Sequence, residues 1–200
     1  MADVARPESA LRTRRAVGAD VPRLAALAAR SFEHAFGPEN DPADLEAYVA
    51  EAFSEERIEA ELAAPESVFL LGFDESRDAE EPVGYCRLVR GARGTAIAGG
   101  DQVQPEGGYG GKAIAGADPV ELERLYVDGA VRGAGYGSAL MWDALELARE
   151  SGCRTIWLGV WERNSGARRF YERWGFEVVG EHEFVLGSDR QRDVLMARAI

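Results

Sequence analysis

One stretch constrains the fold of this 200-residue chain more than any other: a glycine-rich turn between an expected strand and an expected helix. The segment Val120–Val127 predicts a strand, and Ser138–Ser151 has the apolar spacing of an amphipathic helix. Between them, residues 132–137 read Arg-Gly-Ala-Gly-Tyr-Gly. In such a turn the backbone N–H groups converge at the positive end of the helix dipole, and glycine lets an anion approach the backbone closely. We therefore expect residues 132–137 to bind a phosphate group.

Two common nucleotide-binding patterns do not fit this turn. A dinucleotide fingerprint, Gly-x-Gly-x-x-Gly, requires glycine at position 138, where this chain has Ser138. A P-loop requires Gly-Lys followed by Ser or Thr, and the single lysine of the chain is Lys112. The phosphate ligand is therefore expected to belong to another class of molecule.

The order of the expected elements predicts an α+β domain built around one sheet. Asp20 is expected to cap the first helix, with Pro22 in its first turn. Residues 1–9 are expected to be a disordered tail and residues 10–200 a single domain. Nine of the 28 residues in 90–117 are glycine, which predicts a flexible loop insertion. The expected strands are 11–16, 68–73, 82–89, 120–127, 155–160, 177–182 and 194–199, and the expected helices are 20–30, 42–52, 55–63, 138–151 and 164–174.

Composition narrows the class of protein. Hydrophobic residues make up 46% of the chain and charged residues 29%, as in ordinary globular domains. No apolar run approaches the roughly 18 residues of a membrane helix, and residues 1–8 lack the apolar segment of a signal peptide. Cys86 and Cys153 form no Cys-x-x-Cys pair and have no histidine nearby, so neither a zinc site nor a disulfide framework is expected. These features predict a cytoplasmic protein without a metal.

The charge of the chain is concentrated in one block. The net charge of −12 argues against non-specific binding to nucleic acid or to an anionic membrane. Between Glu39 and Glu81 there are 15 acidic residues but only two basic ones, Arg57 and Arg77. This block either attracts a cationic small molecule or is a solvated surface that aids solubility. The sequence leaves both interpretations open.

A second motif lies about thirty residues beyond the glycine-rich turn. Residues 164–171 read Asn-Ser-Gly-Ala-Arg-Arg-Phe-Tyr, and Gly-Phe follows at 175–176. Together with Arg-x-x-Gly-x-Gly at 132–137, this pattern resembles the two signatures of the GNAT superfamily of acetyl-CoA-dependent N-acetyltransferases. The resemblance runs from about Leu11 to the C-terminus. Residues 121–127, 157–164 and 180–184 are most similar to the PaiA-type polyamine N-acetyltransferases, whereas the loop 90–117 is longer and richer in glycine than in that group.

The resemblance implies a GNAT-like domain, with a central, mixed, mostly antiparallel sheet flanked by helices, and acetyl-CoA as cosubstrate. The pantetheine arm would extend along the main chain of Leu125 and Val127, while residues 132–137 hold the pyrophosphate. Asn164 would cap its helix and touch the pantetheine arm, or act as a cap alone. The residues thus assigned to the cofactor are Leu125, Tyr126, Val127, Arg132, Gly133, Ala134, Gly135, Tyr136, Gly137, Asn164, Ala167, Phe170 and Tyr171.

The same resemblance suggests catalytic roles. The N–H of Val127 would donate to the thioester oxygen as it becomes negative. Tyr171 would protonate the leaving thiolate, unless it is only a core tyrosine. Glu121 and Glu123 lie on one face of their strand, so either would accept a proton from the amine through a water molecule or hold the positive charge of the substrate. We favour Glu123 slightly; the alternative is a structural salt bridge with Arg124 or with a helix arginine.

The favoured function is direct transfer of an acetyl group to a primary amine of a polyamine-like small molecule within a ternary complex. Two alternatives stay open: acetylation of a protein N-terminus or a drug-like amine, and a non-catalytic regulator that binds acyl-CoA. The expected partners are acetyl-CoA and the amine, without nucleic acid or membrane, and a homodimer is left open. His34 and His182 are expected to serve packing or hydrogen bonding, and Trp157 and Trp161 to fill the core.

Overall fold

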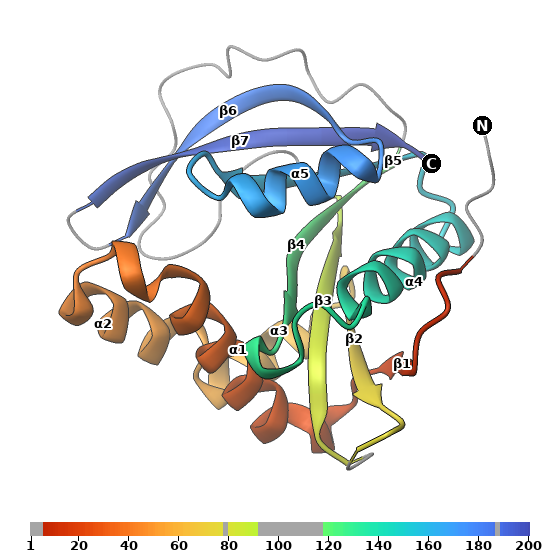
Figure 1. The fold of residues 1–200 in the computed structure, drawn as a ribbon, viewed down its shortest axis with the longest axis horizontal. Helices are drawn as coiled ribbons and strands as arrows, with labels where there is room; N and C mark the ends of the chain where they lie inside the picture. Colours follow the sequence, from red (N-terminus) through yellow and green to blue (C-terminus); the bar gives the residue numbers. More distant parts are fainter. Residues whose placement is uncertain (1–5, 78–79, 92–117, 187–188) are drawn as a thin grey trace.

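The computed structural model describes residues 6–77, 80–91, 118–186 and 189–200, which build one seven-stranded sheet with helices on both faces (Figure 1). The strand order is β1-β2-β3-β4-β5-β7-β6, and every neighbouring pair is antiparallel except β4 and β5. This confirms the expected mixed, mostly antiparallel sheet of an α+β fold. The strands are β1 (Leu11–Arg15), β2 (Ser67–Asp74), β3 (Pro82–Arg90), β4 (Pro119–Val127), β5 (Thr155–Trp161), β6 (Glu177–Leu186) and β7 (Asp189–Ala199).

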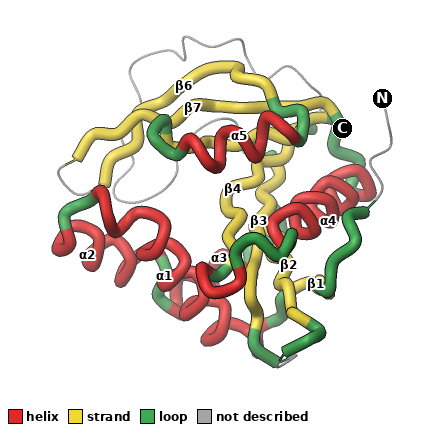
Figure 2. The backbone as a smooth tube through the Cα atoms, viewed as in Figure 1, coloured by secondary structure: helices red, strands yellow, loops and turns green. Residues whose placement is uncertain are grey.

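The helices divide between the two faces of the sheet (Figure 2). Neighbouring strand residues face opposite sides, so Phe69 and Leu71 pack with α1 to α3, whereas Leu70 packs with α4. Helix α5 lies on the α4 side, where Phe170 and Tyr171 pack against the same core cluster. The helices are α1 (Val21–Phe36), α2 (Pro42–Ala52), α3 (Glu55–Ala63), α4 (Tyr136–Glu150) and α5 (Ser165–Arg173), with short 3₁₀ turns η1 (Gly18–Asp20), η2 (Gly37–Glu39) and η3 (Gly129–Val131).

Every expected strand and helix is present, but some bounds differ. Helix α1 continues to Phe36 because Phe32 and Phe36 extend its apolar face as a tilted aromatic pair, with ring centroids 4.4 Å apart. Strands β6 and β7 are longer than expected because they form one extended hairpin. Residues 1–5 of the expected tail and 92–117 of the expected loop lie outside the described residues, while Arg6 pairs with Asp143 of α4.

Asp20 lies at the expected N-cap position of α1, but its side chain makes no capping hydrogen bond, contrary to the expectation from the sequence. Its carboxylate accepts two hydrogen bonds of 2.7 Å from Arg14 and one of 2.8 Å from the N–H of Val17. The pair fixes the entry into the helix from β1, and α1 begins with Pro22 in its first turn, where no N–H partner is required. Arg14 thus binds the Asp20 carboxylate, which would otherwise accept a hydrogen bond from an N–H of the first helical turn.

The two strands at the centre of the sheet part soon after they meet. Strand β4 pairs with β5 only from Pro119 to Glu121, opposite Thr155 to Trp157. Beyond these three pairs the strands separate (Figure 1). The remaining lengths of β4 and β5 therefore face each other without sheet hydrogen bonds.

A β-bulge in β4 lies where this separation begins. Arg87 of β3 is opposite Arg124, but the next residue, Leu88, is opposite Leu122, so Glu123 is an extra residue in β4. A bulge bends its strand and increases the local twist, which agrees with the departure of β4 from β5. It also turns the side chains of Glu123 and Arg124 to the same face, toward α3.

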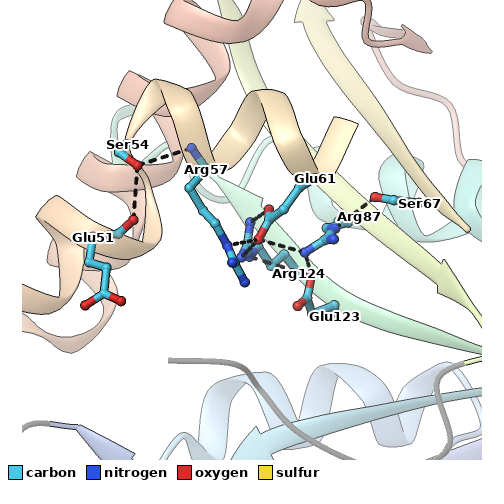
Figure 3. Close-up of polar contacts among 8 residues, drawn as sticks. All are labelled: Glu51, Ser54, Arg57, Glu61, Ser67, Arg87, Glu123 and Arg124. Carbon is cyan, nitrogen blue, oxygen red and sulfur yellow. Dashed lines mark hydrogen bonds and ion pairs between the residues drawn. The ribbon is translucent and has the colours of Figure 1, made fainter. Parts of the chain in front are cut away.

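Buried charges hold the bulge (Figure 3). Glu61 of α3 is 6% exposed and lies 3.0 Å from Arg87, 3.1 Å from Arg57 and 2.6 Å from Arg124. Arg87 in turn lies 2.5 Å from Glu123. We call Glu61, Arg87, Glu123 and Arg124 the Glu61 cluster; it ties the bulge to α3 and to β3.

We predict that Glu61→Gln lowers the free energy of unfolding by about 3 kcal/mol at pH 7, because it leaves buried arginines without their carboxylate. Burial raises the pKa of Glu61, but Arg124, Arg87 and Arg57 outweigh it, so the pKa lies below its ordinary value of 4.5. A lowered pKa gives stability that is complete above 4.5 and is lost as pH falls through the folded-state pKa. Urea unfolding at pH 7 and at low pH measures both effects.

The control for this prediction is Glu59→Gln, an exposed position on the same helix. If Glu61→Gln lowered the free energy of unfolding no more than Glu59→Gln does, a stabilising role of the cluster would be contradicted. If the difference in unfolding free energy between the wild type and Glu61→Gln did not shrink at low pH, the lowered pKa of Glu61 would be contradicted.

Candidate active site

The gap between β4 and β5 opens into a cavity of about 410 Å³. Its walls are residues 122–127 of β4 and 159–161 of β5, together with α1 and α2 residues from one face of the sheet and α5 residues from the other. Two molecules that approach from opposite faces can therefore meet at the one place where the central strands have parted.

The edge of β4 offers backbone hydrogen-bonding groups to this cavity. Val127 lies opposite Gly84, and the N–H of the next residue, Asp128, donates to the carbonyl of Val83 at 2.8 Å. In an antiparallel pair this pattern turns the N–H and C=O of Val127 away from β3 and toward the gap. Leu125, two residues earlier, has the same orientation. An extended ligand can thus bond to β4 in place of β5.

The glycine-rich turn presents further N–H groups. Gly133 and Gly135 have φ of +88° and +80°, a backbone conformation that other residues adopt at a cost. Helix α4 begins at Tyr136, and no hydrogen bond of the described residues uses the N–H of Gly133, Gly135, Tyr136 or Gly137. Arg132 and Gly137 line the cavity next to them. Free N–H groups, a helix N-terminus and an arginine make a binding site for an anion.

Helix α5 brings a phenol to the same cavity. Asn164 caps the helix, because its Oδ1 accepts from the N–H of Ala167 at 3.0 Å. Tyr171 lines the cavity and packs edge-on against Phe176, with ring centroids 5.8 Å apart. Burial, and after it the nearby Cys86, raises the pKa of Tyr171 above its ordinary value of 10.0, so the hydroxyl stays protonated at neutral pH.

The opposite wall is aromatic. Phe32 stacks on Tyr48 at 5.0 Å between ring centroids, and Phe36 lies 5.8 Å from Trp161. All four rings line the cavity, as does Phe53. Trp161 is buried as expected but also forms part of the cavity wall. Such a wall suits the apolar part of a bound molecule.

A hydrogen bond joins two distant segments beside this wall. The side-chain amide of Gln191 on β7 donates to Asn40 Oδ1 at 2.6 Å. Asn40 follows η2, in the connection between α1 and α2, so the bond joins this connection to the C-terminal hairpin. The aromatic side of the cavity is therefore bridged from one half of the sheet to the other.

Three charged residues of the sheet line the cavity: Glu123, Arg124 and Asp193. Glu123 and Arg124 are paired within the Glu61 cluster, so Glu123 does form a salt bridge, with Arg87 at 2.5 Å and less closely with Arg124 at 3.9 Å. Asp193 of β7 has no arginine partner among the described residues. Burial raises the pKa of its carboxyl group to about 6.

Glu121, the other carboxylate that the sequence singled out, does not line the cavity. It lies where β4 and β5 are still paired, opposite Trp157. Burial, and after it the charge of Glu123, raises the pKa of Glu121 to about 8. Of the two candidate carboxylates, the fold thus brings Glu123 to the cavity and leaves Glu121 beside it.

Most of the residues expected from the sequence meet in the cavity, but not all. Gly133, Ala134, Gly135 and Tyr136 do not line it; the side chain of Tyr136 is buried and bonded to Asp74, so only its N–H is available. The expected site residues that do line it are Glu123, Leu125, Tyr126, Val127, Arg132, Gly137, Asn164, Ala167, Phe170 and Tyr171.

Sequence reasoning missed Asp193 and Gln191 because it began the last strand at Val194. Residues 189–193 are all polar or charged, so the sequence carries no apolar alternation that would have extended the strand to include them.

Three further observations concern metal ligands, membrane spans and cysteines. Within the described ranges, no three His, Cys, Asp or Glu side chains come together as ligands for a metal ion. In the same ranges, no helix has the length and apolar character needed to cross a membrane. Cys86 and Cys153 are both buried and free.

Comparison with known sequences gives a consistent result. Residues 23–176 match the acetyltransferase (GNAT) family. An uncharacterised N-acetyltransferase of Lactobacillus delbrueckii subsp. lactis is 32% identical over 182 residues, which cover 90% of this chain and 92% of that protein. An uncharacterised N-acetyltransferase of Mycobacterium tuberculosis is 31% identical over 181 residues, 90% of this chain and 98% of that protein.

Solved structures share the fold at lower identity. The PaiA N-acetyltransferase of Thermoplasma acidophilum, solved with coenzyme A, has a TM-score of 0.68 and 21% identity over 95% of this chain and 99% of that one. Arabidopsis thaliana NAA60, solved with a bisubstrate analogue, has a TM-score of 0.65 and 19% identity over the same shares. The cavity between parted central strands, the free N–H groups of the glycine-rich turn and the family match lead to one conclusion: the chain belongs to the acetyltransferase (GNAT) family and is an acyltransferase that uses acetyl-CoA.

Proposed function

We propose that this protein transfers the acetyl group of acetyl-CoA to a primary amine of a polyamine-like small molecule, by direct attack within a ternary complex. The observation that carries the proposal is the cavity through the sheet, which has hydrogen-bond donors for an anion on the α4–α5 side and aromatic rings with carboxylates on the α1–α2 side.

The donor would bind along β4 and the glycine-rich turn. The main chain of Leu125 and Val127 would bond to its amide-containing arm, and the N–H groups of residues 133–137 to its pyrophosphate. A second hollow of about 200 Å³ adjoins Arg132 and is lined by Arg163 and His34 as well. Arg132 and Arg163 place two positive charges against the one negative charge of Glu39 in the lining of this hollow, which supports an anionic ligand there.

The chemistry would use two groups already in place. The N–H of Val127, which points into the gap, would stabilise the thioester oxygen as it becomes negative. Tyr171 would give a proton to the leaving thiolate. Burial raises the pKa of Tyr171, so its phenol still carries the proton to be donated at neutral pH.

The acceptor would bind from the aromatic side. The rings would contact its methylene groups, and Glu123 and Asp193 are the carboxylates nearest to its ammonium group. Ten of the 15 acidic residues of 39–81 lie in 39–66, on or next to α2 and α3, which cover this face. No described residue of this block other than aromatic ones lines the cavity, so its charges would act on a polycation at a distance.

Acetylation of a protein N-terminus is the second candidate, because an aromatic wall also fits an apolar side chain of a peptide. The Asn40–Gln191 bridge favours the small molecule, since a peptide needs a groove that is open at both ends. Thiol release from acetyl-CoA with spermidine, a monoamine and short peptides decides between them. Release with peptides alone contradicts the polyamine proposal, and no release with any amine points to a non-catalytic regulator.

We predict that Gly135→Val weakens the affinity for coenzyme A more than about tenfold, because the turn loses charge-assisted hydrogen bonds from its N–H groups. Gly152→Val is the matched control: its φ is +79°, with open space around it, at the far end of α4. Both variants bear a backbone strain of about 1–2 kcal/mol. Titration calorimetry with equal affinities for the two variants would contradict the assignment of the turn.

We predict that Tyr171→Phe lowers kcat about tenfold to a thousandfold with little change in KM for acetyl-CoA, because a general acid acts on the transition state. Phenylalanine keeps the packing against Phe176. Tyr85→Phe is the control. The Tyr85 hydroxyl is buried without a hydrogen-bond partner, and Tyr85 does not line the cavity. Full turnover by Tyr171→Phe would reduce Tyr171 to a packing residue.

We predict that KM for spermidine rises several-fold between low salt and about 0.5 M salt, because salt screens charges that lie beyond a Debye length of about 10 Å at 0.1 M. KM for a monoamine with an uncharged tail is expected to rise less. Steady-state kinetics over a salt series measures both values. The same salt dependence for both amines would leave the acidic block as a solvated surface only.

A further inference from the structure

A carboxylate and an imidazole fill a space that a glycine leaves open beside the cavity. Gly159 of β5 lines the cavity, and a Cβ added there would lie 3.5 Å from Asp193 Oδ2 and 3.4 Å from His182 Cε1. Asp193 is paired in register with Trp161 on one side and with His182 on the other. The side chain of Asp193 is only 8% exposed, although it lines the cavity. The strands thus hold a carboxylate at the acceptor side of the gap.

Asp193 differs from the other carboxylate in the cavity wall in its partners. Glu123 is neutralised by Arg87 at 2.5 Å, and Arg87 also contacts Glu61. Asp193 has His182 Nε2 at 3.8 Å, beyond hydrogen-bond distance, and no arginine within the described part of the chain. An ion-paired carboxylate holds a proton weakly, whereas a buried one without a cation holds a proton more strongly. Asp193 is therefore the carboxylate of the two that is not already engaged by an arginine among the described residues.

We propose that Asp193 is a catalytic residue that accepts the proton which the acceptor ammonium group must lose before it attacks acetyl-CoA. This inference rests on the function proposed above and replaces Glu123 as the favoured base. One proton passes from the ammonium nitrogen to the Asp193 carboxylate, and the freed lone pair forms the N–C bond while the C–S bond breaks. The thiolate receives a proton from Tyr171, and the second proton that the nitrogen loses passes through solvent to the Tyr171 phenolate and restores it. Asp193 finally releases its proton to solvent, so one proton is produced for each amide formed.

The surroundings of Asp193 set the pH at which it acts. His182 on β6 is the ionisable neighbour on its own hairpin, and burial lowers the pKa of its imidazole. Tyr48 of α2 is close enough for the charge of Asp193 to act on its phenol. The pKa of Tyr48 is raised to about 12, chiefly by burial and to a lesser extent by nearby carboxylates that include Asp193. Across the cavity lie Glu123 and Arg124, both ion-paired. Burial is the cause of the raised pKa of about 6, so Asp193 is ionised at neutral pH and still able to take a proton.

The test is the pH dependence of kcat/KM for the amine in the wild type and in Asp193→Asn. In the wild type, kcat/KM is expected to rise to a plateau near pH 6, because the enzyme takes the ammonium form and removes its proton. In Asp193→Asn only the free amine reacts, so kcat/KM is expected to rise tenfold per pH unit up to the amine pKa of about 10. At pH 7 the variant is then slower by about a hundredfold to a thousandfold.

Two further comparisons isolate the proton transfer. With an amine that is already neutral at pH 7, the loss in Asp193→Asn is expected to fall below about fivefold, since no base is required. Asp193→Glu is expected to keep a plateau at a reduced rate, because it restores a carboxylate. Glu181→Gln is the matched control, a carboxylate on the same hairpin that is exposed and pairs with Arg192. Unchanged affinity for acetyl-CoA by calorimetry shows that the variants are folded.

The outcomes separate this inference from the function on which it rests. A wild type that acetylates amines, with the plateau retained in Asp193→Asn, overturns the role of Asp193 and leaves the proposed function intact. If the plateau of kcat/KM against pH is lost in Glu123→Gln but kept in Asp193→Asn, Glu123 is the residue that accepts the proton from the ammonium group. A wild type that releases no thiol with any amine overturns both.

Discussion

The parting of β4 and β5 after three residue pairs is the constraint on which the site depends. A parallel pair that continued would bury the main chain of Leu125 and Val127 in hydrogen bonds and would leave no opening between the faces of the sheet. The separation instead leaves their N–H and C=O groups available and opens a cavity of about 410 Å³ at the centre of the domain. Donor and acceptor can then approach from opposite sides, α4–α5 and α1–α2, and meet at Val127.

Charge distribution within the core supports the same arrangement. The bulge at Glu123 places Glu123 and Arg124 on one face, and Glu61 draws both arginines, Arg87 and Arg124, toward α3. Buried ion pairs add little net stability, but removing one member is costly, so the cluster fixes the geometry of β4 more than it strengthens the fold. Because Glu123 is committed to this cluster, the acceptor side retains one carboxylate without an arginine partner in the described residues, Asp193.

The sequence predicted the elements well where periodicity and turn chemistry are local. The predicted bounds agree with the structure to within a residue or two for the helices 42–52 and 55–63 and for the hairpin 68–73 with 82–89. The caps and apolar faces of these elements depend on residues close together in the sequence. The prediction that Asp20 caps α1 was wrong, since Arg14, a residue on β1, competes for its carboxylate. Likewise the length of α1 depends on Phe36 packing against Trp161, which is distant in the chain.

By itself, the sequence determined the fold class and the family, and it predicted the donor side that is proposed here: the spacing from Arg132 to Gly137 and from Asn164 to Tyr171 lies within short segments whose backbone geometry is local. Only the tertiary structure decided which carboxylates reach the cavity. Glu121 and Glu123 lie two residues apart on one strand, yet only Glu123 lines it, and Asp193 joins from β7 because the strand order places β7 beside β5. The burial and partners of a carboxylate, and so its proton affinity, arise from chain segments far apart in sequence.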